Sequence, residues 1–336
     1  MEAVIRAAIT DALKTLSLTE LDFVVEHPAD SAHGDYASNI ALVAAPALGR
    51  APRELAEELT SALRDQIEYV NKIEVAGPGF INFYLAREFF TLELARAREA
   101  GARWGHHETW ANKTVIVEYT DPNPFKEFHI GHLFTNAVGE SIARLFMVSG
   151  ADTKRVNYQG DVGMHVANAI WGMRQMGLAA SSEFTARELG TAYATGATAY
   201  KEDESAAAEM KQINKAIYER SDESINALYD QGRQVSLEYF ATIYDLLGTE
   251  FDEYFFESEA GLIGKEVVLA HPDVFPESDG ARIYHGEAEG LHTRVFINSE
   301  GLPTYEAKEL ALAKLKAERL GAYDHSVIST ANEINE

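Results

Sequence analysis

The stretch "KTVIVEYTDPNPFKEFHIGHLF", Lys113–Phe134, contains the transition that decides the fold. Its first part, Lys113–Tyr119, is apolar and β-branched and predicts a buried strand, which the proline-containing turn after it must end. A long helical pattern begins near His129, and a second strand and a second helix follow Gly150. Strand, helix, strand and helix in this order predict parallel β-α units, which bind ligands at the carboxyl ends of their strands.

Two histidines, His129 and His132, stand at the start of this helix. A helix start exposes unpaired N–H groups and the positive end of the dipole, and Gly131 between the histidines leaves room for a ligand to approach. We therefore expect an anion site. A zinc pair is one alternative, because residues three apart share a helix face, although no third ligand is evident nearby. The other alternative is that this short motif occurs here by chance.

The composition indicates an ordinary globular protein. Its 336 residues favour two domains or more, with 46% hydrophobic and 24% charged residues. No apolar run approaches the roughly 18 residues that a spanning helix needs, and the N-terminus lacks the features of a secretory signal. We expect a cytoplasmic protein that does not bind membranes. The absence of cysteine excludes disulfides and thiolate metal sites.

The net charge of -24 argues against a general affinity for phosphate backbones. Net charge governs solubility and long-range steering, so a local basic groove on an acidic protein remains compatible with it.

The N-terminal third predicts a small α+β domain. Helical patterns cover residues 2–16 and 52–67, and two strands flank the turn Gly77–Gly79. Residues 27–39 are polar and rich in turn formers, so we expect an unburied loop there. A helix from about Glu88 leads to a linker.

The C-terminal half predicts a helical region followed by short strands. Residues 177–247 are largely helical and strongly charged in the middle. Short strands with turns begin near residue 274, and a last helix covers residues 304–320.

The segment Val117–Gly163 resembles the arginyl-tRNA synthetases, which are class Ia aminoacyl-tRNA synthetases. The likeness lies in Glu118, Pro122, Asn123, Lys126, the His129–His132 word, Gly139, Glu140, Ala143, Arg144 and the loop "RVNYQGDVG". Upstream, "HGDYASN" and "VAGPGFINF" resemble the additional N-terminal domain of this family, which contacts the tRNA elbow. Downstream, "FESEAG" and Gly290–Lys316 resemble its second catalytic segment. The likeness covers nearly the whole chain.

The resemblance implies a role for each matching residue. His129, His132 and Lys126 would be catalytic, and together with Gly131 they would bind the ATP phosphates. The arginine substrate would be bound by Glu118, Asn123, Tyr305, Glu309 and Asn332, the last by a loose match. A carboxylate suits the planar fork of a guanidinium. Tyr36 and Asn39 would contact tRNA, by stacking and by reading a base edge.

The sequence departs from the family pattern at two points. The family usually has Asp where Glu309 stands, so either the pocket of this chain is reshaped or the contact made by Glu309 shifts. The alternative is that Glu309 is a solvated carboxylate on a helix. The chain also lacks the KMSKS-type loop of class I synthetases. Many arginine enzymes lack the lysine of that loop and use a lysine just before the motif His129–His132, where Lys126 stands. The alternative is that Lys126 is a solvated surface lysine.

The resemblance also implies an architecture. We expect an α/β protein with a Rossmann-type parallel sheet, a small N-terminal α+β domain and a mostly helical insertion. The expected domains are residues 1–105 (tRNA elbow contact), 106–180 (first half of the catalytic fold), 181–290 (helical or mixed insertion) and 291–336 (return to the catalytic fold). The sheet is expected to be incomplete, with the anticodon-binding domain missing. Aminoacylation by this chain alone is then expected to be weak or absent.

The function expected from the resemblance is that of an arginine–tRNA ligase. ATP, with Mg²⁺, and L-arginine would form arginyl-adenylate, and arginine would pass to the 3′ end of tRNA(Arg). A monomer without a tightly bound protein metal is expected. One alternative is a class Ia synthetase for another amino acid, although the chain has no cysteines for a cysteine enzyme's zinc site and no large editing insertion. The other is a non-catalytic fragment or paralogue that binds only tRNA.

Overall fold

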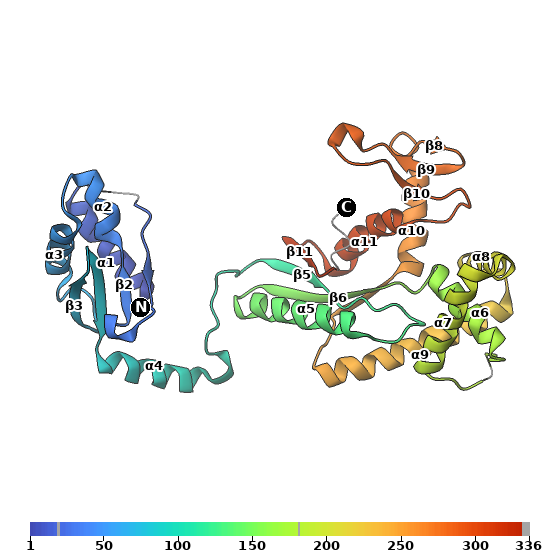
Figure 1. Cartoon of the computed structure of the whole chain (residues 1–336), viewed down its shortest axis with the longest axis horizontal. Coiled ribbons are helices and arrows are strands. Elements are labelled where there is room, and N and C mark those ends of the chain that lie inside the picture. Colours follow the sequence, from blue (N-terminus) through green and yellow to red (C-terminus); the bar gives the residue numbers. More distant parts are fainter. Residues whose placement is uncertain (19–20, 181, 331–336) are drawn as a thin grey trace. The chain divides into compact units, whose positions relative to one another are not determined.

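The structure is a computed structural model that describes residues 1–18, 21–180 and 182–330. The chain forms two compact units, Met1–Trp104 and Gly105–Glu336 (Figure 1). Each unit has its own sheet and core, and each is described by itself. In the described ranges, no helix is both long enough and apolar enough to cross a membrane.

The first unit is a four-stranded antiparallel sheet with helices packed on it. Its elements are α1 (Glu2–Thr15), β1 (Val25–Glu26), β2 (Tyr36–Ser38), α2 (Ile40–Leu48), α3 (Pro52–Leu63), β3 (Val70–Ala76), β4 (Phe80–Leu85) and α4 (Arg87–Ala100), with 3₁₀ turns at Ser31–His33 and Gly101–Arg103. The strand order is β1-β2-β4-β3. The two strands expected around Gly77–Gly79 are therefore present.

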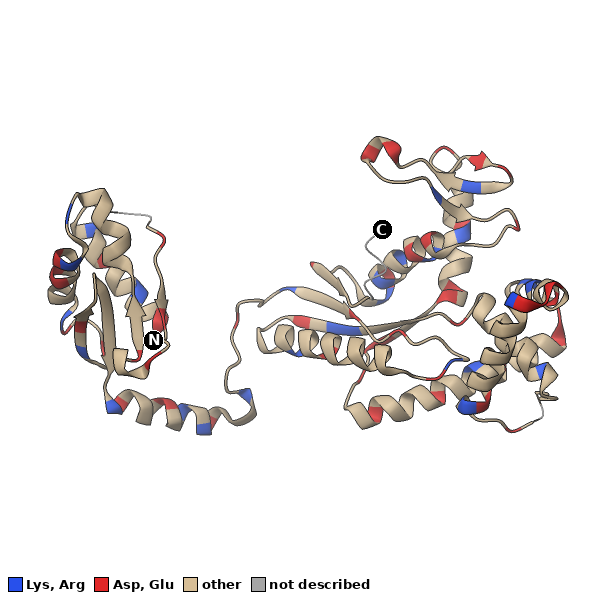
Figure 2. Cartoon of the chain, in the orientation of Figure 1, with Lys and Arg blue, Asp and Glu red and all other residues tan. Residues whose placement is uncertain are grey.

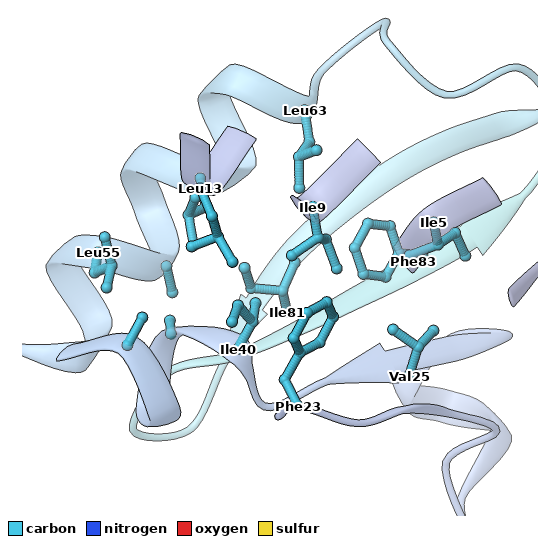
Figure 3. Close-up of a cluster of buried hydrophobic side chains, with 14 of the residues drawn as sticks. Ile5, Ile9, Leu13, Phe23, Val25, Ile40, Leu55, Leu63, Ile81 and Phe83 are labelled. Carbon is cyan, nitrogen blue, oxygen red and sulfur yellow. The ribbon is translucent and has the colours of Figure 1, made fainter. Parts of the chain in front are cut away.

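The core of this unit follows from the helical spacing of its apolar residues. Ile5, Ile9 and Leu13 lie on one face of α1 and are at most 3% exposed. They meet Ile81 and Phe83 of β4, which are fully buried (Figure 3). Alternation along β4 turns these two side chains to the same face of the sheet.

The prediction of an unburied loop over residues 27–39 was wrong in part. The segment includes β2, which pairs with both β1 and β4, and its Ser38 is buried. Gly34 lets the chain enter this strand: its φ is +98°, and a Cβ there would lie 2.7 Å from the carbonyl oxygen of Phe83. The polar composition of this segment does not indicate the short internal strand that it contains.

The second unit contains a parallel sheet, a helical insertion and a small antiparallel sheet. Its elements are β5 (Thr114–Glu118), α5 (Ile130–Val148), β6 (Asp152–Gln159), α6 (Met164–Gln175), α7 (Ala186–Glu202), α8 (Glu204–Glu219), α9 (Glu223–Leu247), β7 (Glu253–Phe256), α10 (Glu257–Ala270), β8 (Glu277–Ser278), β9 (Ala281–Tyr284), β10 (Arg294–Ile297), α11 (Tyr305–Leu320) and β11 (His325–Ile328), with a 3₁₀ turn at Glu287–Glu289.

The main sheet has the order β11-β5-β6-β7 with all neighbours parallel, as the β-α pattern predicted. Helices α6 to α9 are inserted between β6 and β7 and pack on one another (Figure 1). Strands β8 to β10 form a separate sheet between α10 and α11 in the chain. The short strands β7 and β11 and the helix α10 were not predicted.

Both faces of the parallel sheet are covered, and the alternation along β5 decides what each side chain meets. Val115 and Val117 belong to the core that includes Ala143 of α5. Ile116 belongs to the core that includes Leu312 of α11. Glu118, two residues after Ile116, therefore faces the α11 side at the carboxyl end of the strand.

Candidate functional site

A cavity of about 510 Å³ opens at the carboxyl ends of β5 and β6, beside the start of α5. This is the edge at which parallel β-α folds bind ligands. The cavity is lined by Glu118, Thr120, Asp121, Asn123, His129, Gly131, His132, Thr135, Tyr158, Gly160, Glu257, Tyr305, Ile328, Ser329 and Thr330. The histidines at the start of α5 form one part of the lining, and the carboxyl groups of Glu118, Asp121 and Glu257 form another, which we call the acidic end.

His129 and His132 cap the start of α5. The Gly131 N–H donates to His129 Nδ1 at 3.1 Å, and the His129 N–H donates to His132 Nδ1 at 3.3 Å. The two rings stack, with their centroids 3.7 Å apart. Because each Nδ1 accepts a hydrogen bond, the proton of each neutral ring lies on Nε2, which is then the remaining donor.

The charge state of His132 follows from its surroundings. Burial, the neighbouring His129 and the positive Lys126 lower the pKa of His132 to about 4. His132 is therefore a neutral donor near pH 7. No cluster of three or more His, Cys, Asp or Glu side chains suited to a metal occurs in the part of the chain that the structure describes. A neutral N–H donor at a helix start suits an anion.

The turn between β5 and α5 has a strained backbone. Thr120, Asp121 and Phe125 have positive φ values of 77°, 45° and 68°, which is rare for residues other than glycine. Its anchors are hydrogen bonds: the Tyr158 N–H donates to Asp121 Oδ1 at 2.7 Å, and the Phe125 N–H donates to Ser236 Oγ at 2.9 Å. The strain lies in the segment that carries the cavity's polar groups.

Asn123 lies over the β6–α6 loop. A Cβ on Gly160 would fall 2.3 Å from Asn123 Oδ1, so a side chain at position 160 would displace the amide. The Gly160 carbonyl accepts a hydrogen bond of 2.7 Å from His165 Nε2. Burial and the charge of Lys126 lower the pKa of His165 to about 4, so its ring is neutral when it makes this bond.

The acidic end of the cavity begins at Glu118. Its Oε2 lies 2.7 Å from Lys316 Nζ of α11, and both side chains are only 4% exposed. No donor in the described residues is aligned with this oxygen for a hydrogen bond, so the charge of Lys316 offsets its burial. Acidic and basic residues are interspersed along α11 (Figure 2), and Lys316 is one that the fold turns inward.

Tyr305 and Glu309 lie one turn apart on α11. The Tyr305 hydroxyl lies near the Glu309 carboxyl group. Burial and the negative charge of Glu118 raise the pKa of Glu309 to about 7, against the opposing charge of Lys316. Tyr305 is one of the residues that line the cavity, and Glu309 is not.

A second buried ion pair lies at the same end. Lys308 Nζ is 2.5 Å from Glu257 Oε2, with side chains 8% and 17% exposed. Burial raises the pKa of Glu257, and the charge of Lys308 opposes this shift. The buried Tyr158 hydroxyl lies near these carboxyl groups and has no hydrogen-bond partner among the described residues.

Asp161 joins the β6–α6 loop to α9 and α10. It is fully buried, and it accepts hydrogen bonds of 2.8 Å from Arg233 Nε and from both the N–H and the hydroxyl of Ser258. The aspartate of the loop "RVNYQGDVG" is therefore a structural anchor next to Gly160, which lines the cavity.

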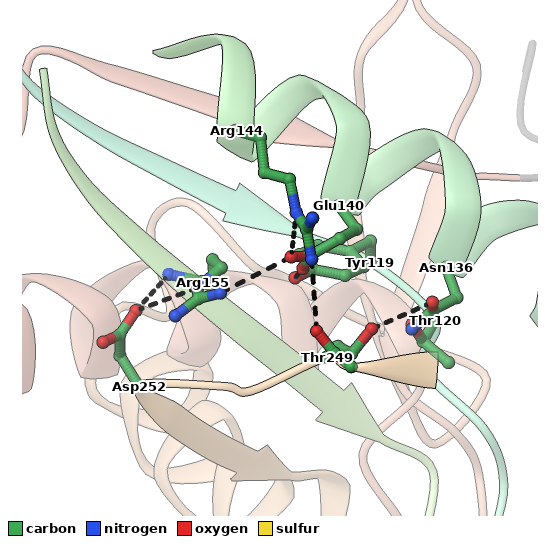
Figure 4. A network of polar contacts seen from close by, with 9 residues as sticks. Tyr119, Thr120, Asn136, Glu140, Arg144, Arg155, Thr249 and Asp252 are labelled. Atoms are coloured by element: carbon green, nitrogen blue, oxygen red, sulfur yellow. Dashed lines mark hydrogen bonds and ion pairs between the residues drawn. The ribbon is translucent and has the colours of Figure 1, made fainter. Parts of the chain in front are cut away.

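Gly139, Glu140 and Arg144 of α5, which carry part of the family resemblance, are also structural. Glu140 accepts hydrogen bonds from Tyr119 and, at 2.8 Å, from Arg144, and it pairs with Arg155 at 3.5 Å (Figure 4). Gly139 lets α5 approach, because a Cβ there would lie 2.2 Å from the Cβ of Tyr119. This network fastens α5 to β5 and β6 and so positions the histidines.

The structure brings most of the expected site residues together. Glu118, Asn123, His129, Gly131, His132 and Tyr305 line one cavity. Lys126 does not line it; its Nζ lies 4.7 Å from the ring centre of Tyr193 on α7. Asn332 lies outside the described residues.

The two expected tRNA contacts lie in the first unit, where both have intramolecular partners. Tyr36 packs against the His27 ring, with centroids 4.3 Å apart. Asn39 precedes α2, and its Oδ1 accepts a hydrogen bond of 2.8 Å from the Val24 N–H. The oxygen of Asn39 is therefore already engaged.

Sequence reasoning missed Asp121, His165, Glu257, Lys308 and Lys316. Asp121 could have been predicted as a site residue, because it follows the predicted strand directly. The two lysines could not, since the charged pattern of α11 is that of a solvated helix.

Two family models match the chain. Residues 3–85 match "Arginyl tRNA synthetase N terminal domain", and residues 98–333 match "tRNA synthetases class I (R), catalytic domain". The chain is 30% identical over 328 residues to the arginine–tRNA ligase of Shewanella pealeana, with 93% of the chain and 56% of the relative covered. It is 31% identical over 305 residues to that of Staphylococcus aureus, with 86% and 53% covered.

Solved structures give the same picture of the fold. The arginyl-tRNA synthetase of Plasmodium falciparum superposes with a TM-score of 0.67 at 20% identity, covering 97% of this chain and 58% of that one. The Thermus thermophilus enzyme gives 0.64 at 25% identity, covering 94% and 53%. The chain spans about half the length of the curated relatives it matches.

Proposed function

Because the chain belongs to the arginyl-tRNA synthetase family, we propose that its cavity binds ATP and L-arginine and forms arginyl-adenylate, from which arginine passes to the 3′ end of tRNA(Arg). The observation that carries the proposal is the division of one cavity into a histidine-capped helix start and an acidic end. The first suits phosphates and the second suits a guanidinium.

At the phosphate end, the Nε2–H groups of His129 and His132 are the donors. They stabilise the negative charge that develops on the α-phosphate when the arginine carboxylate attacks it, and pyrophosphate leaves. Because His132 is already neutral and held by its cap, little reorganisation is needed. The charge of Lys126 adds to the positive potential, since it lies close enough to lower the pKa of His132. Mg²⁺ enters with ATP as part of that substrate.

At the acidic end, Glu118 and Glu309 receive the guanidinium, with Tyr305 beside Glu309 in the cavity wall. A planar fork of donors meets carboxylates better than an ammonium does, and a neutral analogue would leave a buried carboxylate unpaired. Asn123, seated on Gly160, lines the same cavity. It is placed to orient the amino and carboxyl groups of the substrate.

The domain roles belong to the same proposal. Residues 1–105 contact the tRNA elbow through Tyr36, with Asn39 holding the entry to α2. We assign residues 106–180 and 291–336 to the catalytic fold, together with β7, which pairs with β6 in the parallel sheet, and the rest of residues 181–290 to the insertion. We place the protein in the cytoplasm as a monomer that acts on tRNA(Arg) and does not bind membranes.

Calorimetry with L-arginine and with Mg·ATP tests the proposal. Glu118→Gln should weaken arginine binding by about tenfold or more and change Mg·ATP binding by less than about twofold. The matched control is Glu250→Gln, an exposed carboxylate away from the cavity, which should change neither. Equal losses for both substrates would contradict the role of Glu118.

A pyrophosphate-exchange assay with tRNA(Arg) tests the reaction itself. His132→Asn should lower exchange by about a hundredfold, because a phosphate donor is lost. The Kd for arginine should stay within about threefold, since the substitution leaves the acidic end intact. A loss of arginine binding equal to the loss of exchange would contradict the division of the cavity.

A further inference from the structure

The turn between β5 and α5 is held in an uncommon conformation by a helix of the insertion. Asn123 of this turn lines the cavity, and Phe125, two residues later, is fully buried with a φ of +68°. Residues other than glycine rarely adopt such a φ unless the surrounding structure fixes it. The contacts that fix it come from Ser236 and its neighbours on α9, and Ser236 lies 111 residues from Phe125 in the chain.

Ser236 holds the backbone of the turn. Its Oγ accepts a buried hydrogen bond of 2.9 Å from the Phe125 N–H, and its hydroxyl donates to the Gly232 carbonyl at 2.8 Å. Ser236 is 1% exposed, so solvent does not compete for the Phe125 N–H. Removing the hydroxyl would leave that N–H buried without this acceptor, which costs more than an ordinary hydrogen bond contributes. Ser236 therefore stabilises the positive φ of Phe125.

Gly232 holds the ring of the same phenylalanine. A Cβ at position 232 would lie 2.3 Å from Phe125 Cε1, so a larger residue would push the ring away from α9. The Tyr229 ring stacks with the Phe125 ring, with the centroids 6.2 Å apart. Glycine is unfavourable inside a helix, and the close approach of Phe125 gives the reason for one here. Spacings of three and four residues place Tyr229, Gly232 and Ser236 on one face of α9.

The same face of α9 also holds the other loop of the cavity. Arg233 Nε donates a hydrogen bond of 2.8 Å to Asp161. Asp161 directly follows Gly160, on which Asn123 lies. The structure describes every residue of α9, and none of them lines the cavity. An effect of α9 on a ligand must therefore pass through these two loops.

We propose that Ser236 is a positioning residue: by holding the Phe125 N–H it keeps Asn123 in place at the cavity, so that the inserted helix α9 sets the affinity for L-arginine without touching it. This inference rests on the proposed function, because it takes arginine as the ligand of Asn123. The Lys126 N–H donates to the Asn123 carbonyl at 3.3 Å, which closes the turn around Phe125. Loss of the Ser236 hydroxyl therefore reaches Asn123.

The expected effect is a change in the population of the binding-competent turn. Without the hydroxyl the turn is free to leave its positive φ, and only the molecules that keep it bind arginine fully. Because the apparent Kd rises as the inverse of their fraction, Ser236→Ala should raise the Kd for L-arginine by about tenfold. The Kd for Mg·ATP should change by less than about threefold, because the caps of α5 hold His129 and His132 in either state of the turn.

The matched control destabilises the same helix away from the turn. Asp222 caps α9, and its Oδ1 accepts hydrogen bonds of 2.9 and 3.0 Å from the N–H groups of Ser224 and Ile225. Asp222 is exposed, and Asp222→Ala removes the cap. Calorimetry of the full chain should give this variant the same Kd for arginine as the parent. Equal losses in the two variants would mean that Ser236 only supports α9, and would overturn the proposal.

Hydrogen exchange tests the hold on the turn without any ligand. The measurement is mass spectrometry of a peptide that covers residues 119–128. Ser236→Ala should make one amide in this peptide exchange about tenfold faster or more, because the Phe125 N–H loses its acceptor. Asp222→Ala should leave the exchange of the peptide unchanged.

A double-variant cycle tests the route to the ligand. In a chain that already carries Asn123→Ala, Ser236→Ala should raise the Kd for arginine by less than about twofold, because its effect passes through Asn123. If Ser236→Ala does not fold, Gly232→Ala takes its place and should weaken arginine binding by displacing the Phe125 ring. Adding Phe125→Leu should then restore part of the affinity, because the shorter side chain leaves room for the methyl group. No recovery would contradict the route through Phe125.

Three results would overturn the inference alone: unchanged exchange over residues 119–128 in Ser236→Ala, an unchanged Kd for arginine in that variant, or a loss that persists in full when Asn123 is alanine. Failure of the parent chain to bind arginine at millimolar concentrations is a different outcome. It would overturn the proposed function, while the exchange measurement would still report whether Ser236 holds the turn.

Discussion

Gly160 lies directly beneath the amide of Asn123, and a methyl group at position 160 would fall 2.3 Å from Asn123 Oδ1. We predict that Gly160→Ala weakens L-arginine binding by about tenfold, because Asn123 must leave its place. The measurement is calorimetry. In a chain that already carries Asn123→Ala, the same glycine substitution should cost little. Equal losses in both backgrounds would show that Gly160 acts by another route.

Asp161 should be among the most important residues for stability in the second unit. Asp161→Asn leaves the partly buried Arg233 without its carboxylate, and we expect a loss of about 3 kcal/mol in the free energy of unfolding. The control is Asp230→Asn. It breaks the pair between Arg220 and Asp230, whose side chains are 51% and 56% exposed, and should cost less than about 1 kcal/mol. Urea unfolding followed by tryptophan fluorescence compares the two, and similar losses would contradict the anchoring role of Asp161.

Glu140 should stabilise the seat of α5. Glu140→Gln removes the charge shared by Arg144 and Arg155, and we expect a loss of about 2 kcal/mol. The exposed helical pair Lys215–Glu219 supplies the control, since Glu219→Gln should cost about 0.5 kcal/mol or less. The shift of the urea midpoint gives both values. A loss no larger than the control's would mean that the network in Figure 4 contributes little to stability.

His165 should make stability fall in acid. Its pKa is about 4 in the folded chain, against about 6.5 for an unperturbed histidine. Between these values the unfolded state binds the proton and the folded state does not, so stability decreases as pH falls through this window. His165→Gln should flatten the decrease and keep a donor for the Gly160 carbonyl. His165→Ala should flatten it too but lower stability at every pH. Thermal unfolding across the window distinguishes these cases, and an unchanged slope in both variants would contradict the assignment.

The sequence identified residues whose position in a strand or helix determines where the side chain points. Glu118 follows a buried strand, and His129 begins a helix, so their place at one sheet edge could be predicted. Ser38 and Lys316 could not. The first lies in a three-residue strand within a polar segment, and the second in a helix whose charges look solvated. Only the packing of α11 behind Glu118 makes a buried ion pair of it, and that contact joins segments far apart in the chain.

The short strand β11 also determines when the cavity can form during synthesis of the chain. It lies beside β5, and its approach is fixed by Asp324, whose carboxylate accepts a hydrogen bond from the Thr114 N–H across 210 residues. At roughly 5–20 residues per second, a ribosome needs on the order of ten to forty seconds to add that much chain. Until then the apolar strand Thr114–Glu118 has an open edge, which other chains can pair with and chaperones can protect. The nascent protein therefore contains His129 and His132 long before it contains Tyr305 and Ile328, which line the same cavity.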